Sequence, residues 1–171
     1  MRQLILAAAF AFAAPALAFA HGPTPQKVEE KIEIKAEPAK VWALVKDFGG
    51  IKAWHPSVES VEAKDGERKL KVKGGAELEE SRDESDDASM TLGYRLSNEG
   101  TDAFPTSSYS ATIVVKAAGG GSEVTWQGRG YRLDTSNEPP EGKDDPAAVK
   151  ALSDFFKAGL EGLKKKAEGQ G

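Results

Sequence analysis

Hydrophobic residues follow two different periods along the chain. Across residues 28–35 apolar and charged positions alternate, which predicts a half-buried strand. In the segment that follows, Pro38 suits the first position of a helix, and Gly49 with Gly50 ends it. The apolar positions between them recur at helical spacing, at Val41, Leu44, Val45 and Phe48. A strand, a helix and one further helical turn before Pro56 therefore open the fold.

Short alternating runs separated by turn residues fill the middle of the chain. Asp65-Gly66, Gly74-Gly75 and the glycines at 119–121 are typical of tight turns between antiparallel strands. Six strands are predicted, on the alternation in residues 58–63, 68–73, 76–84, 90–96 and 109–115 and in a last run that begins near Val124.

The last long element is an amphipathic helix. Asp145 is its expected cap, Pro146 its first position and Lys166 its approximate end, with lysines 164–166 where the helix dipole favours them. Its apolar stripe comprises Val149, Leu152, Phe156, Leu160 and Leu163, with Phe155 at the border. Gly159 and Gly162 interrupt it, either to make room for a ligand or to let the helix approach the sheet.

This order of elements predicts an α+β fold. A lone antiparallel sheet must bury its apolar face, and only the last helix is long enough to cover it. We therefore expect a curved antiparallel sheet wrapped around a long C-terminal helix, with two short helices after the first strand. The domain spans residues 28–167 and leaves a tail at 168–171.

The first twenty residues have the composition of a signal peptide. Arg2 supplies a positive start, residues 4–14 are apolar, and Ala18-Phe19-Ala20 is a cleavage site of the A-x-A type. The pattern predicts export, in bacterial style to the periplasm, with no stable membrane insertion; the alternative is an uncleaved membrane anchor. Residues 21–27 then form a flexible mature N-terminus.

Composition excludes several classes of function. The chain has 171 residues and a formal charge of −4, and its basic residues are dispersed among acids, which argues against nucleic-acid binding. It has no cysteine, so disulfides, thioether-linked haem and thiolate metal sites are absent. No cofactor is expected.

Two stretches resemble a known superfamily. The run "IEIKAEPAKVWALVKDFGGIKAWHPSVESVE" and the later "GYRLSNEGTDAFPTSSYSATIVVKAAGGGSEVTWQGRGY" are similar to SRPBCC proteins, which include START-type, Bet v 1-type and polyketide-cyclase-like members. The resemblance covers residues 28–166. It implies the helix-grip fold, with a cavity between the sheet and the long helix.

A narrower resemblance concerns methanol oxidation. The signal peptide, the mature start "HGPTPQKVEEKIEI" and the opening stretch are similar to the periplasmic MxaD-type accessory proteins. That resemblance implies a role in helping a PQQ-containing methanol dehydrogenase interact with its c-type cytochrome.

Large amphipathic side chains are the candidates for lining the cavity. Tyr94 and Tyr109 share a face with apolar neighbours, so they are expected to point inward. The superfamily resemblance places Trp54 and His55 at the cavity mouth. The alternative is that these rings pack directly against the helix and leave little void. The full set is Trp54, His55, Glu80, Arg82, Tyr94, Tyr109, Trp126, Phe155 and Phe156.

The charged run "ELEESRDESDD" contains two of these candidates. Alternation from Leu78 directs Glu80 and Arg82 toward the concave face, where two charges must pair or stay hydrated. Glu80 also falls where cyclase-like relatives carry a glutamate. The alternative is a solvated strand end. The outward acids could be a solvated face, steer a basic partner or bind calcium, although EF-hand spacing is absent: Glu77, Glu79, Asp83 and Glu84.

The two histidines allow further chemistry. If cleavage follows Ala20, His21 becomes the new N-terminus and could chelate copper with His55, against the alternative of a plain flexible tail. His55 could also act as a general base, but no nucleophile-elbow motif accompanies it. A binding or gating role at the cavity mouth is favoured for His55.

Three functions remain open at this point. The first is a non-enzymatic accessory protein that brings a dehydrogenase and its cytochrome together by surface contact. The second is a binding module for a small hydrophobic ligand or lipid. The third is a cyclase- or hydratase-like enzyme that uses Glu80, Arg82, His55 or Tyr109, although spacing alone does not bring these groups together.

Overall fold

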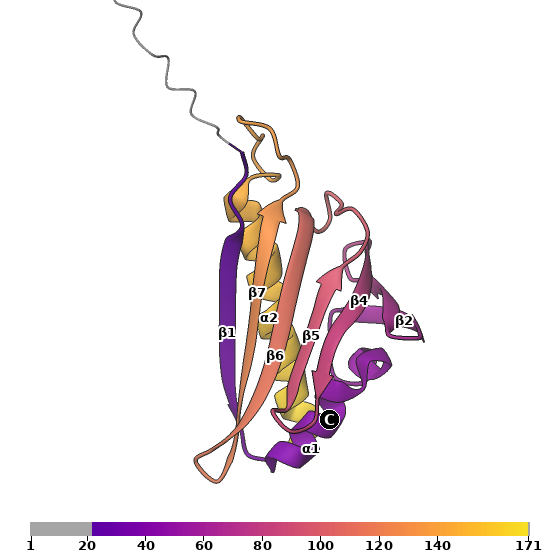
Figure 1. Cartoon of the computed structure of the whole chain (residues 1–171), viewed down its shortest axis with the longest axis vertical. Coiled ribbons are helices and arrows are strands. Elements are labelled where there is room, and N and C mark those ends of the chain that lie inside the picture. The colour runs from indigo at the N-terminus through magenta and orange to yellow at the C-terminus, as the bar shows by residue number, and fades with distance from the viewer. Residues whose placement is uncertain (1–21, 171) are drawn as a thin grey trace, which may run out of the picture.

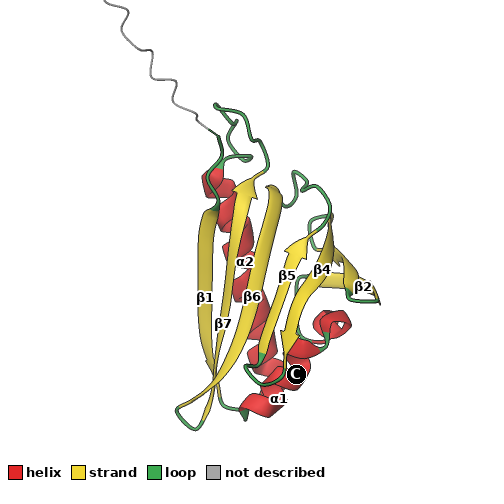
Figure 2. Cartoon of the chain, viewed as in Figure 1, coloured by secondary structure: helices red, strands yellow, loops and turns green. Residues whose placement is uncertain are grey.

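The structure, a computed structural model, describes residues 22–170 and confirms the predicted architecture. Within these residues the chain forms seven strands and three helical segments in the expected order (Figures 1 and 2). The elements are β1 (Gln26–Ile34), α1 (Pro38–Lys46), the 3-10 helix η1 (Phe48–Ala53), β2 (Val58–Lys64), β3 (Glu67–Val72), β4 (Ala76–Asp86), β5 (Thr91–Leu96), β6 (Thr106–Ala118), β7 (Gly121–Arg132) and α2 (Asp145–Ala167).

The strands form one antiparallel sheet in the order β1-β7-β6-β5-β4-β3-β2. Each strand from β2 onward pairs with its neighbour in sequence, whereas β1 pairs with β7 at the far end of the chain. Helix α2 runs along one face of the curved sheet, and α1 lies near its C-terminal end (Figure 1). This is the helix-grip arrangement that the order of elements predicts.

Most strands differ from their predicted ranges by one to three residues at one end or both. Strand β1 begins at Gln26, because Gln26 and Lys27 pair with Gly130 and Arg129 of β7, so these two residues do not belong to a flexible N-terminus. The predicted signal peptide and His21 lie outside the described residues. Among residues 22–170, no helix combines the length and apolar character that a membrane span requires.

Helix α2 begins one residue earlier than predicted. Its cap is Asp144, whose carboxylate accepts the N–H of Ala147 at 3.0 Å. Asp145 is the first helical residue, and its carboxylate lies 3.2 Å from the guanidinium of Arg132. That ion pair ties the start of α2 to the end of β7.

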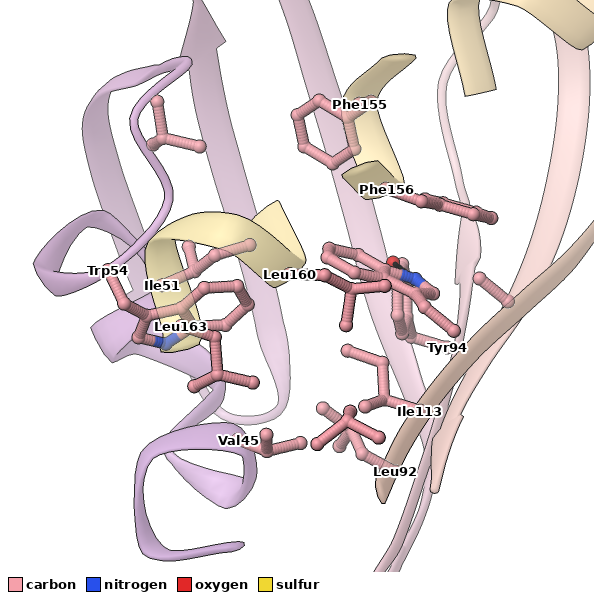
Figure 3. Close-up of a cluster of buried hydrophobic side chains, with 14 of the residues drawn as sticks. Val45, Ile51, Trp54, Leu92, Tyr94, Ile113, Phe155, Phe156, Leu160 and Leu163 are labelled. Carbon is pink, nitrogen blue, oxygen red and sulfur yellow. Dashed lines mark hydrogen bonds between the residues drawn. The ribbon is translucent and has the colours of Figure 1, made fainter. Parts of the chain in front are cut away.

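The core between the sheet and α2 is filled with side chains (Figure 3). The indole of Trp126 stacks on the ring of Phe156, with centroids 4.7 Å apart and planes inclined by 14°. Both side chains expose 0% of their surface, so no water-sized space adjoins them. In β7, Gly128 makes this contact possible, because a Cβ there would lie 2.9 Å from the Phe156 ring.

Candidate functional site

A buried ion pair lies inside the sheet. Arg68 of β3 and Glu80 of β4 are directly opposite each other across the two strands, and both point inward. Nε of Arg68 donates to Oε2 of Glu80 at 2.5 Å, and the two side chains expose 2% and 0% of their surface. Charges taken out of water to this extent are tolerated only when they are paired and hydrogen-bonded.

Two tyrosines and a backbone carbonyl complete what we call the arginine cluster (Arg68, Glu80, Tyr94 and Tyr109). The hydroxyl of Tyr109 donates to Oε1 of Glu80, and Nη1 of Arg68 donates to the carbonyl of Phe48 at 2.9 Å. The guanidinium carbon lies 4.0 Å from the ring centroid of Phe48 and 5.0 Å from that of Tyr94, within cation–π range. Nη2 of Arg68 has no hydrogen-bond partner among the described residues.

The tyrosines of the cluster stay protonated at neutral pH. Burial raises the pKa of Tyr94 and of Tyr109 well above the ordinary value, and the negative charge of Glu80 raises both further. The hydroxyl of Tyr94 accepts the indole N–H of Trp126 at 2.9 Å. Neither phenol is therefore available as a base.

Sequence reasoning placed Glu80 correctly and chose the wrong arginine. Arg82 was expected beside Glu80, but it is exposed. Strand β3 pairs with β4 only as far as Ser81, so Arg82 lies beside the β2–β3 turn, with its side chain near Gly66. Arg68 occupies the inward position instead. The alternation of Arg68 with the buried Leu70 and Val72 was the signal that could have identified it.

His55 is a core residue rather than a residue of a cavity mouth. Its side chain is among the largest fully buried ones, and its ring centroid lies 4.1 Å from that of Phe155. Nε2 lies 3.0 Å from the carbonyl of Phe155, and Nδ1 accepts the N–H of Ser57 at 3.2 Å. This arrangement fixes the neutral tautomer with its proton on Nε2. With both nitrogens engaged, His55 offers no lone pair to copper and no free base for catalysis.

Burial lowers the pKa of His55 to about 4, although the Phe155 carbonyl opposes the shift, and the positive charge of Arg68 lowers it further. The imidazole of His55 takes up its second proton more readily in the unfolded chain than in the folded protein. The contribution of neutral His55 to the free energy of unfolding is therefore present above about pH 6.5 and is lost as the pH falls toward 4. We expect a loss of about 2 to 3 kcal/mol over that interval. Urea unfolding at several pH values measures it.

The variant His55→Gln is the control for this pH dependence. It should be less stable than the parent at neutral pH and lose less stability on acidification. A proton NMR titration in which His55 ionises near its ordinary pKa would contradict the assignment.

Gly159 and Gly162 bring α2 close to the loop before β2. A Cβ on Gly159 would lie 2.4 Å from the Trp126 ring and 2.7 Å from the His55 ring. A Cβ on Gly162 would lie 1.9 Å from the carbonyl oxygen of Trp54. Of the two roles considered for these glycines, the close approach of the helix is the one observed.

The aromatic candidates pack on one another instead of lining a void. Trp54 exposes 6% of its surface, donates its indole N–H to the carbonyl of Leu44 at 3.3 Å, and contacts the edge of Trp126. Phe155 lies between the rings of His55 and Trp126. The inward direction predicted for Tyr94 and Tyr109 is observed. The ligand-binding role of all these residues stays a prediction.

The outward acids of β4 are largely neutralised by neighbouring strands. Lys69 lies 3.2 Å from the carboxylates of both Glu77 and Glu79, and Arg95 lies 2.6 Å from that of Asp83. This pairing favours a solvated, self-compensated face over one that attracts a basic partner. Within residues 22–170, no three His, Cys, Asp or Glu side chains lie close enough together to hold a metal ion.

The arginine cluster has the parts of an acid–base site, but its side chains are buried. A carboxylate, a guanidinium and a phenol converge, as general acid–base chemistry requires. Each side chain exposes 5% of its surface or less, and the carboxylate already accepts two hydrogen bonds. As it stands, the cluster holds strands β3, β4 and β6 together.

Comparison with known proteins identifies the family. The sequence profile of the family described as "Polyketide cyclase / dehydrase and lipid transport" matches residues 25–168, nearly the whole described chain. The chain belongs to this family. Its description includes both catalysis and transport, so membership in the polyketide cyclase family does not decide between an enzyme and a binding protein. A search of the curated proteins found no match.

Solved structures support the fold that the polyketide cyclase family implies. The protein XoxI from Bacillus cereus is 23% identical, with a TM-score of 0.70 over 82% of this chain and 94% of that one. A START superfamily protein from Mycobacterium smegmatis is 13% identical, with a TM-score of 0.66 over 85% and 99%. The Zhui aromatase/cyclase from a Streptomyces species is 19% identical, with a TM-score of 0.67 over 85% and 94%.

Proposed function

We propose that this protein is an exported, non-enzymatic accessory protein that acts through its surface. In the form that the MxaD-type resemblance suggests, it works in the periplasm and promotes the interaction of a PQQ methanol dehydrogenase with its c-type cytochrome. The observation that carries the proposal is the closed interior. The side chains that would line a helix-grip cavity fill it, and the two buried charges, Arg68 and Glu80, pair with each other.

The closed interior argues against the two rival functions, ligand binding and catalysis, because both need space inside the protein. A pocket that binds a drug-sized ligand needs several hundred Å³ of space inside the protein. Here Trp126 and Phe156 stack where that space would be, and His55 has both nitrogens engaged. A ligand or substrate would first have to open a packed core, whereas surface contact requires no such rearrangement.

The test is electron transfer from purified methanol dehydrogenase to its cytochrome, with and without this protein. Contacts between transient partners are small and polar, so stimulation should be largest at low ionic strength and fall as salt shortens the screening length to about 3 Å at 1 M. Heat-unfolded protein at equal concentration serves as the control. Absence of stimulation at every ionic strength would remove the proposal.

A second function is favoured by one observation, the free Nη2 of Arg68. A buried donor without a partner costs about 1 to 3 kcal/mol, and an oxygen atom of a bound ligand would relieve that cost. The ligand would have an apolar body and a carbonyl or carboxylate head. Room for it would come from movement of Phe48 and Tyr94, whose rings cover the guanidinium.

Native mass spectrometry of protein purified from its own host separates the two functions. A stoichiometric added mass that is extracted into organic solvent favours the binding module. The bare chain mass, together with stimulation of electron transfer, favours the accessory protein.

A further inference from the structure

A groove at the C-terminal end of α2 carries positive charge around an apolar floor. It has a volume of about 280 Å³ and lies between the end of η1 and the last turns of α2. We call it the lysine groove, and its principal residues are Lys52, Trp54, Pro56, Gly162, Lys165 and Lys166. Ala53 and His55 complete its lining, which contains no acidic residue.

The three lysines of the groove have no carboxylate partner. Among the ion pairs within residues 22–170, none involves Lys52, Lys165 or Lys166, and all three side chains are exposed. The nearest acids along α2 are Glu161 and Glu168, and neither lines the groove. Glu168 accepts the backbone N–H of Lys35 at 2.8 Å.

The charge of the groove comes from two separate elements. Lysines at the end of α2 are explained by the negative end of the helix dipole. The dipole of α2 does not explain Lys52, which lies in the last turn of the separate helix η1 and reaches the same opening. A structural role for the helix therefore accounts for only part of this charge.

The floor of the groove is held by close packing and by a hydrogen bond. Because Gly162 lacks a side chain, α2 approaches the backbone of Trp54 and the ring of Pro56 closely. The indole of Trp54 is held by its hydrogen bond to the Leu44 carbonyl. A partner therefore meets a preformed apolar surface, which lowers the entropic cost of binding.

We propose that the lysine groove docks an acidic segment of a partner protein, in which an apolar side chain is flanked by aspartates or glutamates. The apolar side chain would rest on the exposed Pro56 and on the small part of Trp54 that reaches the surface, while the acids pair with the lysines. The chain as a whole carries a charge of −4, so a flat anionic bilayer would repel its other surfaces. A narrow segment that enters the groove lies close to the groove lysines and away from the negative charge on the rest of the surface. This inference rests on the proposed function and assigns the docking surface that it needs.

The probe is the peptide acetyl-Glu-Glu-Phe-Glu-Glu-amide, titrated into ¹⁵N-labelled full-length mature protein and followed by NMR. The backbone amides of Lys52, Trp54, Gly162 and Lys165 should shift, and those of the β4 face should not. Replacing both Lys165 and Lys166 with glutamine should raise Kd about tenfold, as should an increase of salt from about 20 to about 300 mM. The neutral peptide acetyl-Gln-Gln-Phe-Gln-Gln-amide is the second comparison. Its Kd for the parent protein should be at least as high as the Kd of the Lys165→Gln/Lys166→Gln variant for the acidic peptide.

The matched control is the double variant Lys27→Gln/Lys116→Gln, which removes the same charge from exposed positions of strands β1 and β6. The Kd of this control variant for the acidic peptide should equal that of the parent protein. Equal weakening in both double variants, or shifts that do not centre on the groove, would overturn the proposal. So would lysine-dependent binding to vesicles of about 30 mol% phosphatidylglycerol without any peptide response, because the occupant would then be a membrane.

The electron-transfer assay separates this inference from the proposed function. If the parent protein stimulates transfer and Lys165→Gln/Lys166→Gln stimulates it equally, the groove is not the docking surface although the function stands. If the peptide binds in the groove but no stimulation occurs at any ionic strength, the groove stands and the proposed function fails.

Discussion

Replacing Glu80 with leucine is expected to lower the free energy of unfolding by about 3 to 5 kcal/mol. The reason is that Arg68 would remain charged and buried without its carboxylate, and the hydroxyl of Tyr109 would lose its acceptor. Urea denaturation at neutral pH measures the effect, provided that the slope against denaturant stays the same as in the parent.

A double variant decides whether the loss comes from the uncompensated charge. Arg68→Met/Glu80→Leu removes both charges and fills similar volume, so it should recover most of the stability lost in Glu80→Leu. The exposed pair of Asp83 and Arg95 supplies the control, since Asp83→Asn should cost less than about 1 kcal/mol. If the double variant loses as much as the two single variants together, charge burial is not the cause.

Replacing Gly162 with alanine is expected to destabilise the protein by about 3 kcal/mol, although the same change normally stabilises a helix by about 1 kcal/mol. The new Cβ would overlap the carbonyl oxygen of Trp54, which is backbone and cannot rotate away. The helix would have to move from the loop that carries His55 and Pro56. Thermal and urea unfolding both report the change.

The neighbouring exposed position is the matched control for this prediction. Glu161→Ala adds no atom toward the loop and should change stability by no more than about 0.5 kcal/mol. Gly159→Ala should resemble Gly162→Ala, because its Cβ would meet the Trp126 and His55 rings. A stabilising effect of Gly162→Ala would show that the loop and α2 are farther apart than described.

The fold was predictable because its signals are local. Alternation identified the strands, and the apolar stripe identified α2 as the element that covers the sheet. Errors occurred at the ends of elements. Asp144 and Asp145 are equivalent cap residues by type; in the structure Asp144 caps the helix, and Asp145 pairs with Arg132 at the end of β7.

The candidate site was predictable only in part because its residues depend on distant contacts. Glu80 followed from strand alternation, and Arg68 could have followed from the same rule. The burial of His55 could not be predicted from the local sequence, since its hydrogen-bond partner is the carbonyl of Phe155, 100 residues away. The inward direction predicted for Arg82 was wrong because alternation within β4 does not show that the neighbouring strand β3 ends opposite Ser81, one residue before Arg82.

The pairing of β1 with β7 has a consequence for the order of folding. The first strand finds its partner only after about three quarters of the sequence has been made, because Gln26 pairs with Gly130. Strands β2 to β7 can assemble as successive hairpins, but the edge of β7 stays open until β1 returns to it. Such long-range closure slows folding and leaves an unpaired edge exposed in the interval. The N-terminal strand β1 therefore stays unpaired until β7 has been made.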